Sequence, residues 1–111
     1  MTDDQRVTLA DALARAQESP DAFATVLLHG ELQVGLYTPS GVDPQKPHAR
    51  DELYVVMRGA GWFVNGDARE PFGPGDILHV PAGVEHRFEE FTDDFATWVV
   101  FYGPERGERV S

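Results

Sequence analysis

The sequence predicts a single all-β domain, a jelly-roll barrel of short strands with one short helix before it. After Pro20 the apolar residues occur in runs of strand length, without the spacing of three and four residues that marks an amphipathic helix. Glycine, proline, asparagine and aspartate separate about eight such runs at regular intervals, as in barrels and jelly rolls. We divide the 111 residues into an N-terminal segment (1–21), a barrel (22–103) and a C-terminal tail (104–111).

The helix is expected directly after Thr8. The residues Thr8 to Asp11 resemble a capping box, in which side chains satisfy the free N–H groups of a first helical turn. Apolar residues then recur at positions 9, 12, 13 and 16, on one helical face, and Ser19-Pro20 ends the segment. This helix carries no chemical motif, and we expect it to pack against the outside of the main body.

Eight strands should follow the helix. Their expected ranges, in order, are 22–28, 31–38, 51–58, 61–64, 68–70, 77–80, 85–90 and 96–102. Asn65-Gly66 is the best hairpin signal in the chain, because both residues tolerate the positive φ angles of a tight two-residue turn. The stretch 39–44 is a loop by composition.

Composition and charge limit the chemistry and the partners. Absence of cysteine excludes disulfides, thiolate catalysis and zinc–thiolate sites. No apolar run approaches the roughly 20 residues of a membrane span, and the acidic start is unlike a secretory signal, so we expect a cytoplasmic protein that does not act at a membrane. The formal net charge of −10 repels phosphate backbones and argues against nucleic acid as a partner.

Two segments carry candidate metal ligands. His48 and Glu52 are four residues apart at the start of an expected strand, where side chains alternate, so both can project to one face. Further along, Gly75 and the turn Pro81-Ala82-Gly83 precede His86. Two imidazoles and one carboxylate suit iron, manganese, nickel, cobalt or zinc better than magnesium or calcium.

These segments resemble the two conserved motifs of the cupin superfamily, over roughly residues 30–103. Glu52 and Gly59 keep the interval of the first motif, His48 matches the second histidine of its His-x-His pair, and the second motif is matched at every one of its positions: Gly75, Pro81, Gly83 and His86. The resemblance implies a double-stranded β-helix fold, one divalent metal ion on His48, Glu52 and His86, and a homodimer.

The sequence departs from the superfamily pattern in two places. Lys46 occupies the position of the first histidine, and a charged lysine is a poor ligand, so the predicted site has three protein ligands. The amide oxygen of Gln45 could fill the gap if the loop bends inward. Glu90 stands where an asparagine often follows the second-motif histidine. A three-ligand site leaves positions open for water, dioxygen or a chelating substrate.

Strand alternation also suggests residues that could move a proton. Tyr54 and Val56 should share the inner face with Glu52, and Phe88 and Glu90 should share it with His86. Tyr54 and Glu90 are the candidate catalytic residues, although Tyr54 could instead only fill space and Glu90 could sit at the rim in water. The other large aromatic residues are assigned to core packing or a dimer interface: Tyr37, Trp62, Trp98, Phe101 and Tyr102.

The sequence leaves function open among three classes. The first is a small metalloenzyme with dioxygenase-, isomerase- or lyase-like chemistry on a small-molecule substrate. The second is a non-catalytic module that binds a small molecule in the same barrel, and the third is an accessory protein that acts through dimer contacts. A metal-free polar core, in which both histidines hydrogen-bond Glu52, is the structural alternative to the metal site.

Overall fold

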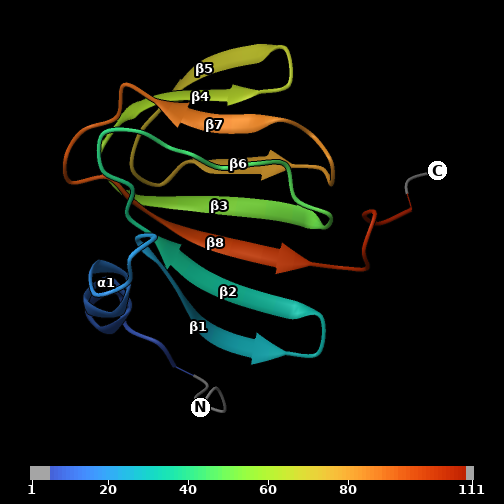
Figure 1. The fold of residues 1–111 in the computed structure, drawn as a ribbon, viewed down its shortest axis with the longest axis horizontal. Coiled ribbons are helices and arrows are strands. Elements are labelled where there is room, and N and C mark those ends of the chain that lie inside the picture. Colours follow the sequence, from blue (N-terminus) through green and yellow to red (C-terminus); the bar gives the residue numbers. More distant parts are fainter. Residues whose placement is uncertain (1–5, 110–111) are drawn as a thin grey trace.

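The computed structural model describes residues 6–109, which form one helix and eight strands (Figure 1). In chain order these are α1 (Leu9–Gln17), β1 (Phe23–His29), β2 (Leu32–Tyr37), β3 (Asp51–Arg58), β4 (Gly61–Asn65), β5 (Ala68–Phe72), β6 (Ile77–Val80), β7 (His86–Glu89) and β8 (Ala96–Tyr102). The expected helix and all eight expected strands are present, with ends that differ by at most two residues. Residues 1–5, 110 and 111, part of the expected N-terminal segment and tail, lie outside the described residues.

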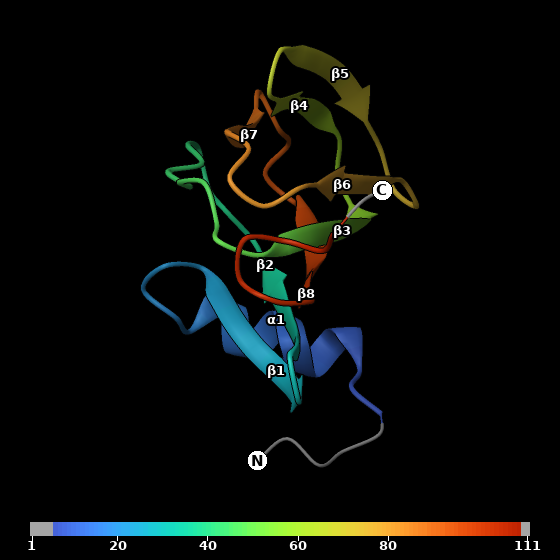
Figure 2. The same cartoon turned by 90° about the vertical axis from the view of Figure 1, so that its right-hand side faces the viewer.

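The strands form two antiparallel sheets. The larger sheet has the order β1-β2-β8-β3-β6, and the smaller one has the order β5-β4-β7. In both views the smaller sheet lies at one end of the molecule and β1 with α1 lies at the other (Figures 1 and 2). Among the described residues no strand of one sheet pairs with a strand of the other, so the body is a two-sheet jelly roll instead of a fully closed hydrogen-bonded barrel. The predicted all-β fold with a short N-terminal helix is confirmed.

The helix covers the larger sheet at its β1–β2 end. The Thr8 hydroxyl accepts a hydrogen bond from the backbone N–H of Asp11, as its capping position predicts. Ala12, Leu13 and Ala16 are buried in a small apolar cluster that includes Val26 of β1 and Leu36 and Ala96 of the sheet. At nine residues, this one helix of the described chain is too short to cross a membrane.

An aromatic core fills the space between the sheets. The buried rings of Tyr54 on β3, Phe63 on β4, Phe88 on β7 and Phe95 before β8 are within one cluster, with neighbouring ring centroids 4.7–5.7 Å apart. Such separations suit edge-to-face and offset packing. This core fixes how far the two sheets stand apart, and so fixes the distance between residues that face each other across them.

Strand β3 lies inside the larger sheet, between β8 and β6. Its register pairs Glu52 with Phe101 on one side and with Val80 on the other. The alternation predicted for this strand holds, because Glu52, Tyr54 and Val56 are buried while the next residue, Met57, is exposed. On the opposite sheet, His86 begins β7 and pairs with Asn65 of β4. Glu52 and His86 therefore approach each other from different sheets.

Candidate metal centre

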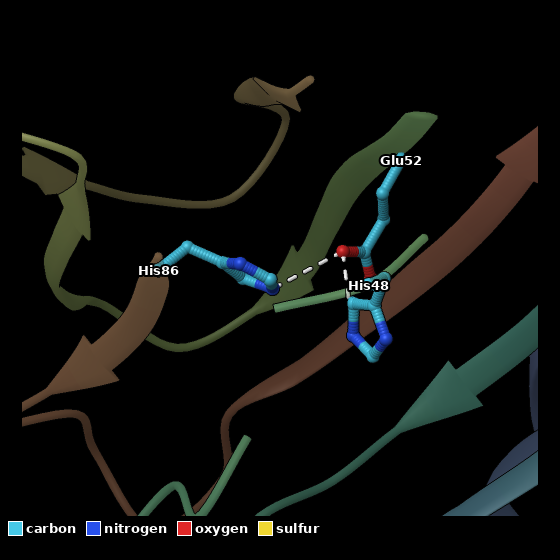
Figure 3. A group of neighbouring side chains, drawn as sticks. All are labelled: His48, Glu52 and His86. Carbon is cyan, nitrogen blue, oxygen red and sulfur yellow. Dashed lines mark ion pairs between the residues drawn. The ribbon is translucent and has the colours of Figure 1, made fainter. Parts of the chain in front are cut away.

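His48, Glu52 and His86 converge in the structure. One nitrogen of each histidine and one oxygen of the glutamate all lie within 4.8 Å of one another. Glu52 Oε1 is 3.1 Å from His86 Nε2 and 3.7 Å from His48 Nε2 (Figure 3). The three residues come from β3, from the loop before it and from β7, so long-range packing and not local sequence brings them together.

One hydrogen-bonded turn sets the positions of both histidines. Gly83 has a φ of 81°, a conformation that glycine adopts without strain, and its N–H donates to the His48 carbonyl over 2.7 Å. This bond ties the Pro81–Gly83 turn to the segment that carries His48. Across the turn, the chain then enters β7 with the His86 ring directed at Glu52 (Figure 3). The glycine of the second motif thus connects the two halves of the site.

The buried polar atoms of this group lack partners. Glu52 and His86 are only 1% and 2% exposed, yet Glu52 Oε1, Glu52 Oε2 and His86 Nε2 make no hydrogen bond of acceptable geometry within the protein. A buried polar atom without a partner typically destabilises a fold by about 1–3 kcal/mol. A cation at this point would satisfy all three atoms, so the residues present fit a metal ion.

The tautomer of His86 also suits metal binding. His86 Nδ1 lies 3.0 Å from the Val84 carbonyl, to which it can donate only as N–H, leaving Nε2 as the lone-pair nitrogen. Burial lowers the pKa of His86, but the Glu52 carboxylate 3.1 Å away and the hydrogen bond to the Val84 carbonyl outweigh burial and raise the net pKa above its ordinary value. The lone-pair nitrogen faces Glu52, as a metal ligand would.

A cavity of about 340 Å³ adjoins the cluster. His48 and Glu52 form part of its wall, and the other lining residues are Asp21, Phe23, Tyr37, Pro44, Gln45, Val99 and Phe101. Tyr37 and Phe101, which the sequence assigns to packing or an interface, do pack in or against the aromatic core, and they also line the cavity. Strand alternation is the signal that could have found Phe101, because it pairs with Glu52 in the register of β8.

The loop before β3 is held by Asp43, a residue that no sequence pattern selects. Its buried carboxylate accepts hydrogen bonds from the Tyr37 hydroxyl (2.6 Å), the Gln45 N–H (3.2 Å), the Gln45 side-chain amide (2.8 Å) and the Phe88 N–H (2.8 Å). Burial together with the hydrogen bond to Asp43 raises the pKa of Tyr37 far above its ordinary value, so this phenol keeps its proton. Asp43 thereby ties the loop to β2 and to β7.

Gln45 and Lys46 point to different environments. Lys46, at the position where the superfamily motif has a histidine, is exposed. Gln45 is half-buried, lines the cavity, and places its Oε1 3.4 Å from His48 Nε2. The inward bend that Gln45 would need is therefore present.

Tyr54 lies beneath this group. Its hydroxyl donates to Gln45 Oε1 over 2.8 Å, and its ring centroid is 6.1 Å from that of His86. Burial, and then the nearby Glu52 carboxylate, raise the pKa of Tyr54 well above its ordinary value. The phenol therefore remains protonated at neutral pH and can donate a hydrogen bond but not act as a base.

Glu90 does not join the site, and its predicted place on the inner face is wrong. Strand β7 ends at Glu89, and Glu90 adopts a φ of 50°, which breaks the alternation of side chains. Its side chain is 73% exposed and accepts a hydrogen bond from the Arg69 guanidinium at 2.8 Å. The prediction from strand alternation fails here because side chains alternate between faces only while the backbone remains extended.

Two antiparallel sheets enclose a His/Glu/His cluster, and a cavity adjoins it. These features place the chain among small β-barrel proteins with a candidate metal centre. A family model described as the cupin domain matches residues 33–102. The chain belongs to the cupin family.

Relatives of known sequence and structure agree with this assignment. An uncharacterized protein of Streptomyces coelicolor is 37% identical over 86 residues, which cover 76% of this chain and 82% of that protein. An acireductone dioxygenase of Rhodopseudomonas palustris is 34% identical over 92 residues, 79% of this chain but only 55% of the dioxygenase. The crystal structure of a cupin-2 domain protein from Shewanella frigidimarina superposes with a TM-score of 0.68 at 19% identity, over 87% of this chain and 94% of that one.

Proposed function

We propose that this cupin is a metal-dependent enzyme that holds one divalent transition metal ion on His48, Glu52 and His86 and acts on a small molecule in the adjoining cavity. The observation that carries the proposal is the set of three buried, partnerless atoms, Glu52 Oε1 and Oε2 and His86 Nε2, beside that cavity. A polar cluster built only for stability would give these atoms well-formed hydrogen bonds, whereas here the 3.1 Å contact between Glu52 Oε1 and His86 Nε2 is not one and Glu52 Oε2 has no partner.

The ligand set narrows the choice of metal. Two neutral imidazoles and one carboxylate suit iron, manganese, nickel, cobalt and zinc, and three protein ligands leave coordination positions for a substrate. When bound, such an ion supplies Lewis-acid polarisation of a substrate oxygen and, if it is redox-active, access to chemistry with dioxygen. His48, whose side chain is 34% exposed, and Glu52 form part of the cavity wall, whereas the buried His86 does not line the cavity.

The cavity favours a small substrate with an apolar body. Its volume of about 340 Å³ is at the lower end for small-molecule sites. Phe23, Val99 and Phe101 supply apolar wall, and among the described residues no lysine or arginine lines the cavity. Asp21 adds negative charge at the wall. A phosphorylated or polycarboxylate substrate would find no counter-charge there, so we propose a compound of low charge with an oxygen-bearing end that meets the metal.

The reaction class that we propose is oxygenation. The support is the 34% identity to acireductone dioxygenases, of which this chain spans about half the length. We propose acireductone or a compound of the same chemical class as substrate. Tyr54, which keeps its proton and donates a hydrogen bond to Gln45 Oε1, would hold that side chain in place at the site. Glu90 is left without a role in proton transfer, because it is exposed and paired with Arg69.

Elemental analysis of protein purified without chelator or metal-affinity tag tests the metal centre. We expect close to one transition metal ion per chain, and little or none in the double variant His48→Ala/His86→Ala. Oxygen uptake with acireductone as the first substrate then tests the reaction, with the metal-loaded double variant as control. Protein that neither carries metal nor takes up added iron, manganese, nickel, cobalt or zinc would refute the enzyme. Metal without oxygen uptake or substrate turnover would favour a binding module.

A further inference from the structure

We infer that Gln45, through its side-chain oxygen, is a fourth protein ligand of the metal centre. The inference rests on the metal centre proposed above and concerns a residue one position before Lys46, where the superfamily motif has its first histidine. Lys46 is exposed and leaves that ligand position unfilled. Gln45 Oε1 occupies the corresponding region, 3.4 Å from His48 Nε2.

The orientation of the Gln45 amide is fixed by its partner. Gln45 Nε2 donates to Asp43 Oδ2 over 2.8 Å, and an ionised carboxylate can only accept hydrogen bonds. The amide nitrogen must therefore face Asp43, and the oxygen must face His48 and Tyr54. Tyr54 donates to the same oxygen, which uses one of its two lone pairs. The second lone pair faces His48 Nε2 at 3.4 Å, and it is available to a cation when that nitrogen carries no proton, as in a metal-bound histidine.

The spacing of the polar atoms agrees with a shared ion. Ligand atoms about 2.1 Å from one metal ion, in tetrahedral or octahedral arrangement, lie roughly 3.0–3.4 Å from their neighbours. Two distances fall in this range, 3.1 Å from Glu52 Oε1 to His86 Nε2 and 3.4 Å from His48 Nε2 to Gln45 Oε1, and the 3.7 Å from Glu52 Oε1 to His48 Nε2 lies slightly above it. Gln45 Oε1 thus lies at the spacing of a neighbouring ligand from His48 Nε2.

Asp43 is the positioning residue of this arrangement. Its carboxylate is held by the Phe88 N–H of β7 and by the Tyr37 hydroxyl of β2, so the loop is anchored to both sheets. Gln45 follows two residues later, with its own N–H also bonded to Asp43. The loop thus turns residue 45 inward and residue 46 outward. As a result, the amide oxygen of Gln45 takes the place of the histidine that the superfamily motif has at position 46.

The test is a titration of chelator-treated full-length protein with Co²⁺, read by its visible absorption and by the dissociation constant. Four proteins are compared: the wild type, Gln45→Ala, Gln45→Glu and Lys46→Ala. Gln45→Ala and Gln45→Glu both lose the hydrogen bond to Asp43, but only Gln45→Glu keeps an oxygen that can coordinate. Lys46→Ala is the matched control, since it changes an exposed side chain of the same loop. Thermal unfolding without metal shows that each variant is folded.

We expect Gln45→Ala to weaken Co²⁺ binding by about ten- to a hundred-fold and to alter the Co²⁺ spectrum. Gln45→Glu should bind at least as tightly as the wild type, and Lys46→Ala should match the wild type in both readouts. Equal weakening in Gln45→Ala and Gln45→Glu, or wild-type affinity and spectrum in Gln45→Ala, would overturn the inference while leaving the three-residue centre intact. Failure of the wild type itself to bind Co²⁺ would instead refute the metal centre on which the inference rests.

Discussion

Replacing Glu52 by glutamine should stabilise the metal-free protein and abolish tight metal binding. The Glu52 carboxylate is buried, and its Oε1 faces the lone-pair nitrogen of His86 at 3.1 Å without a hydrogen bond between them. The amide introduced by Glu52→Gln has nearly the same shape and can donate to His86 Nε2. The substitution therefore removes a buried charge and satisfies a buried acceptor at once.

The size of the gain follows from the hydrogen bond that the new amide makes with His86. Relief of a buried partnerless group is worth about 1–3 kcal/mol, which for a domain of this length raises the melting temperature by roughly 4–12 °C. The gain should depend on pH. Because the folded pKa of His86 is raised, stability from a protonated His86 paired with Glu52 is complete below the unfolded pKa of about 6.5 and is lost as pH rises through the folded pKa. The advantage of Glu52→Gln should thus be small near pH 6 and largest near pH 9.

Thermal unfolding in chelator at both pH values measures this effect. The same measurement with a transition metal ion then tests whether metal binding depends on the Glu52 carboxylate. Free metal at a thousand times its dissociation constant adds about 4 kcal/mol to the wild type, so metal should reverse the order of the two melting temperatures. Glu70→Gln, which changes an exposed carboxylate on β5, serves as the control and should move neither value. A lower melting temperature for Glu52→Gln in chelator at about pH 9 would show that the carboxylate has partners, contrary to the reasoning.

The remaining predictions concern the frame around the site. Phe88→Ala should lower the free energy of unfolding by about 3–5 kcal/mol, measured by denaturant titration, because Phe88 is fully buried between the sheets. Thr8→Ala should cost about 1 kcal/mol in the same assay through loss of the helix cap. Hydrogen bonds from the N–H groups of Glu108 and Ala82 lower the pKa of Asp51, and the stability they add is present above the unfolded pKa of 3.8 and lost as pH falls through the folded value. Asp51→Asn should therefore have a lower melting temperature than the wild type at about pH 7 and nearly the same one at about pH 2. The homodimer stays a prediction, and the molar mass from light scattering should test it.

Much of the fold could be predicted because its signals are local. Strand β3 is indicated by five consecutive apolar residues with glycine after the strand, and β4 and β5 are separated by Asn65-Gly66, where the structure has its tight turn. The helix begins where Thr8 caps it. Division into two sheets was not predictable, since the pairing of β7 with β4 and of β8 with β2 joins segments far apart in sequence.

Within the site, the predictions succeeded where side-chain direction is set by an extended backbone. His86 and Phe88 are both buried on β7, as alternation requires. The same rule fails two residues later, because Glu90 takes a positive φ and turns toward Arg69. A positive φ in a glutamate has no sequence signal comparable to that of glycine, so the position of Glu90 could not be anticipated.

The loop before β3 shows why the sequence could name Gln45 as a candidate ligand but could not predict that its loop bends inward. A motif fixes residue types at fixed offsets and therefore directs attention to position 46, which holds a lysine. The side chain that reaches the site is selected instead by Asp43, whose bonds to Phe88 and Tyr37 depend on the two sheets being already packed together. A ligand supplied by a loop residue can shift by one position without loss of the site, provided that the anchor of the loop is kept. Comparison of cupins by their loop anchors should therefore find metal centres that comparison by histidine spacing misses.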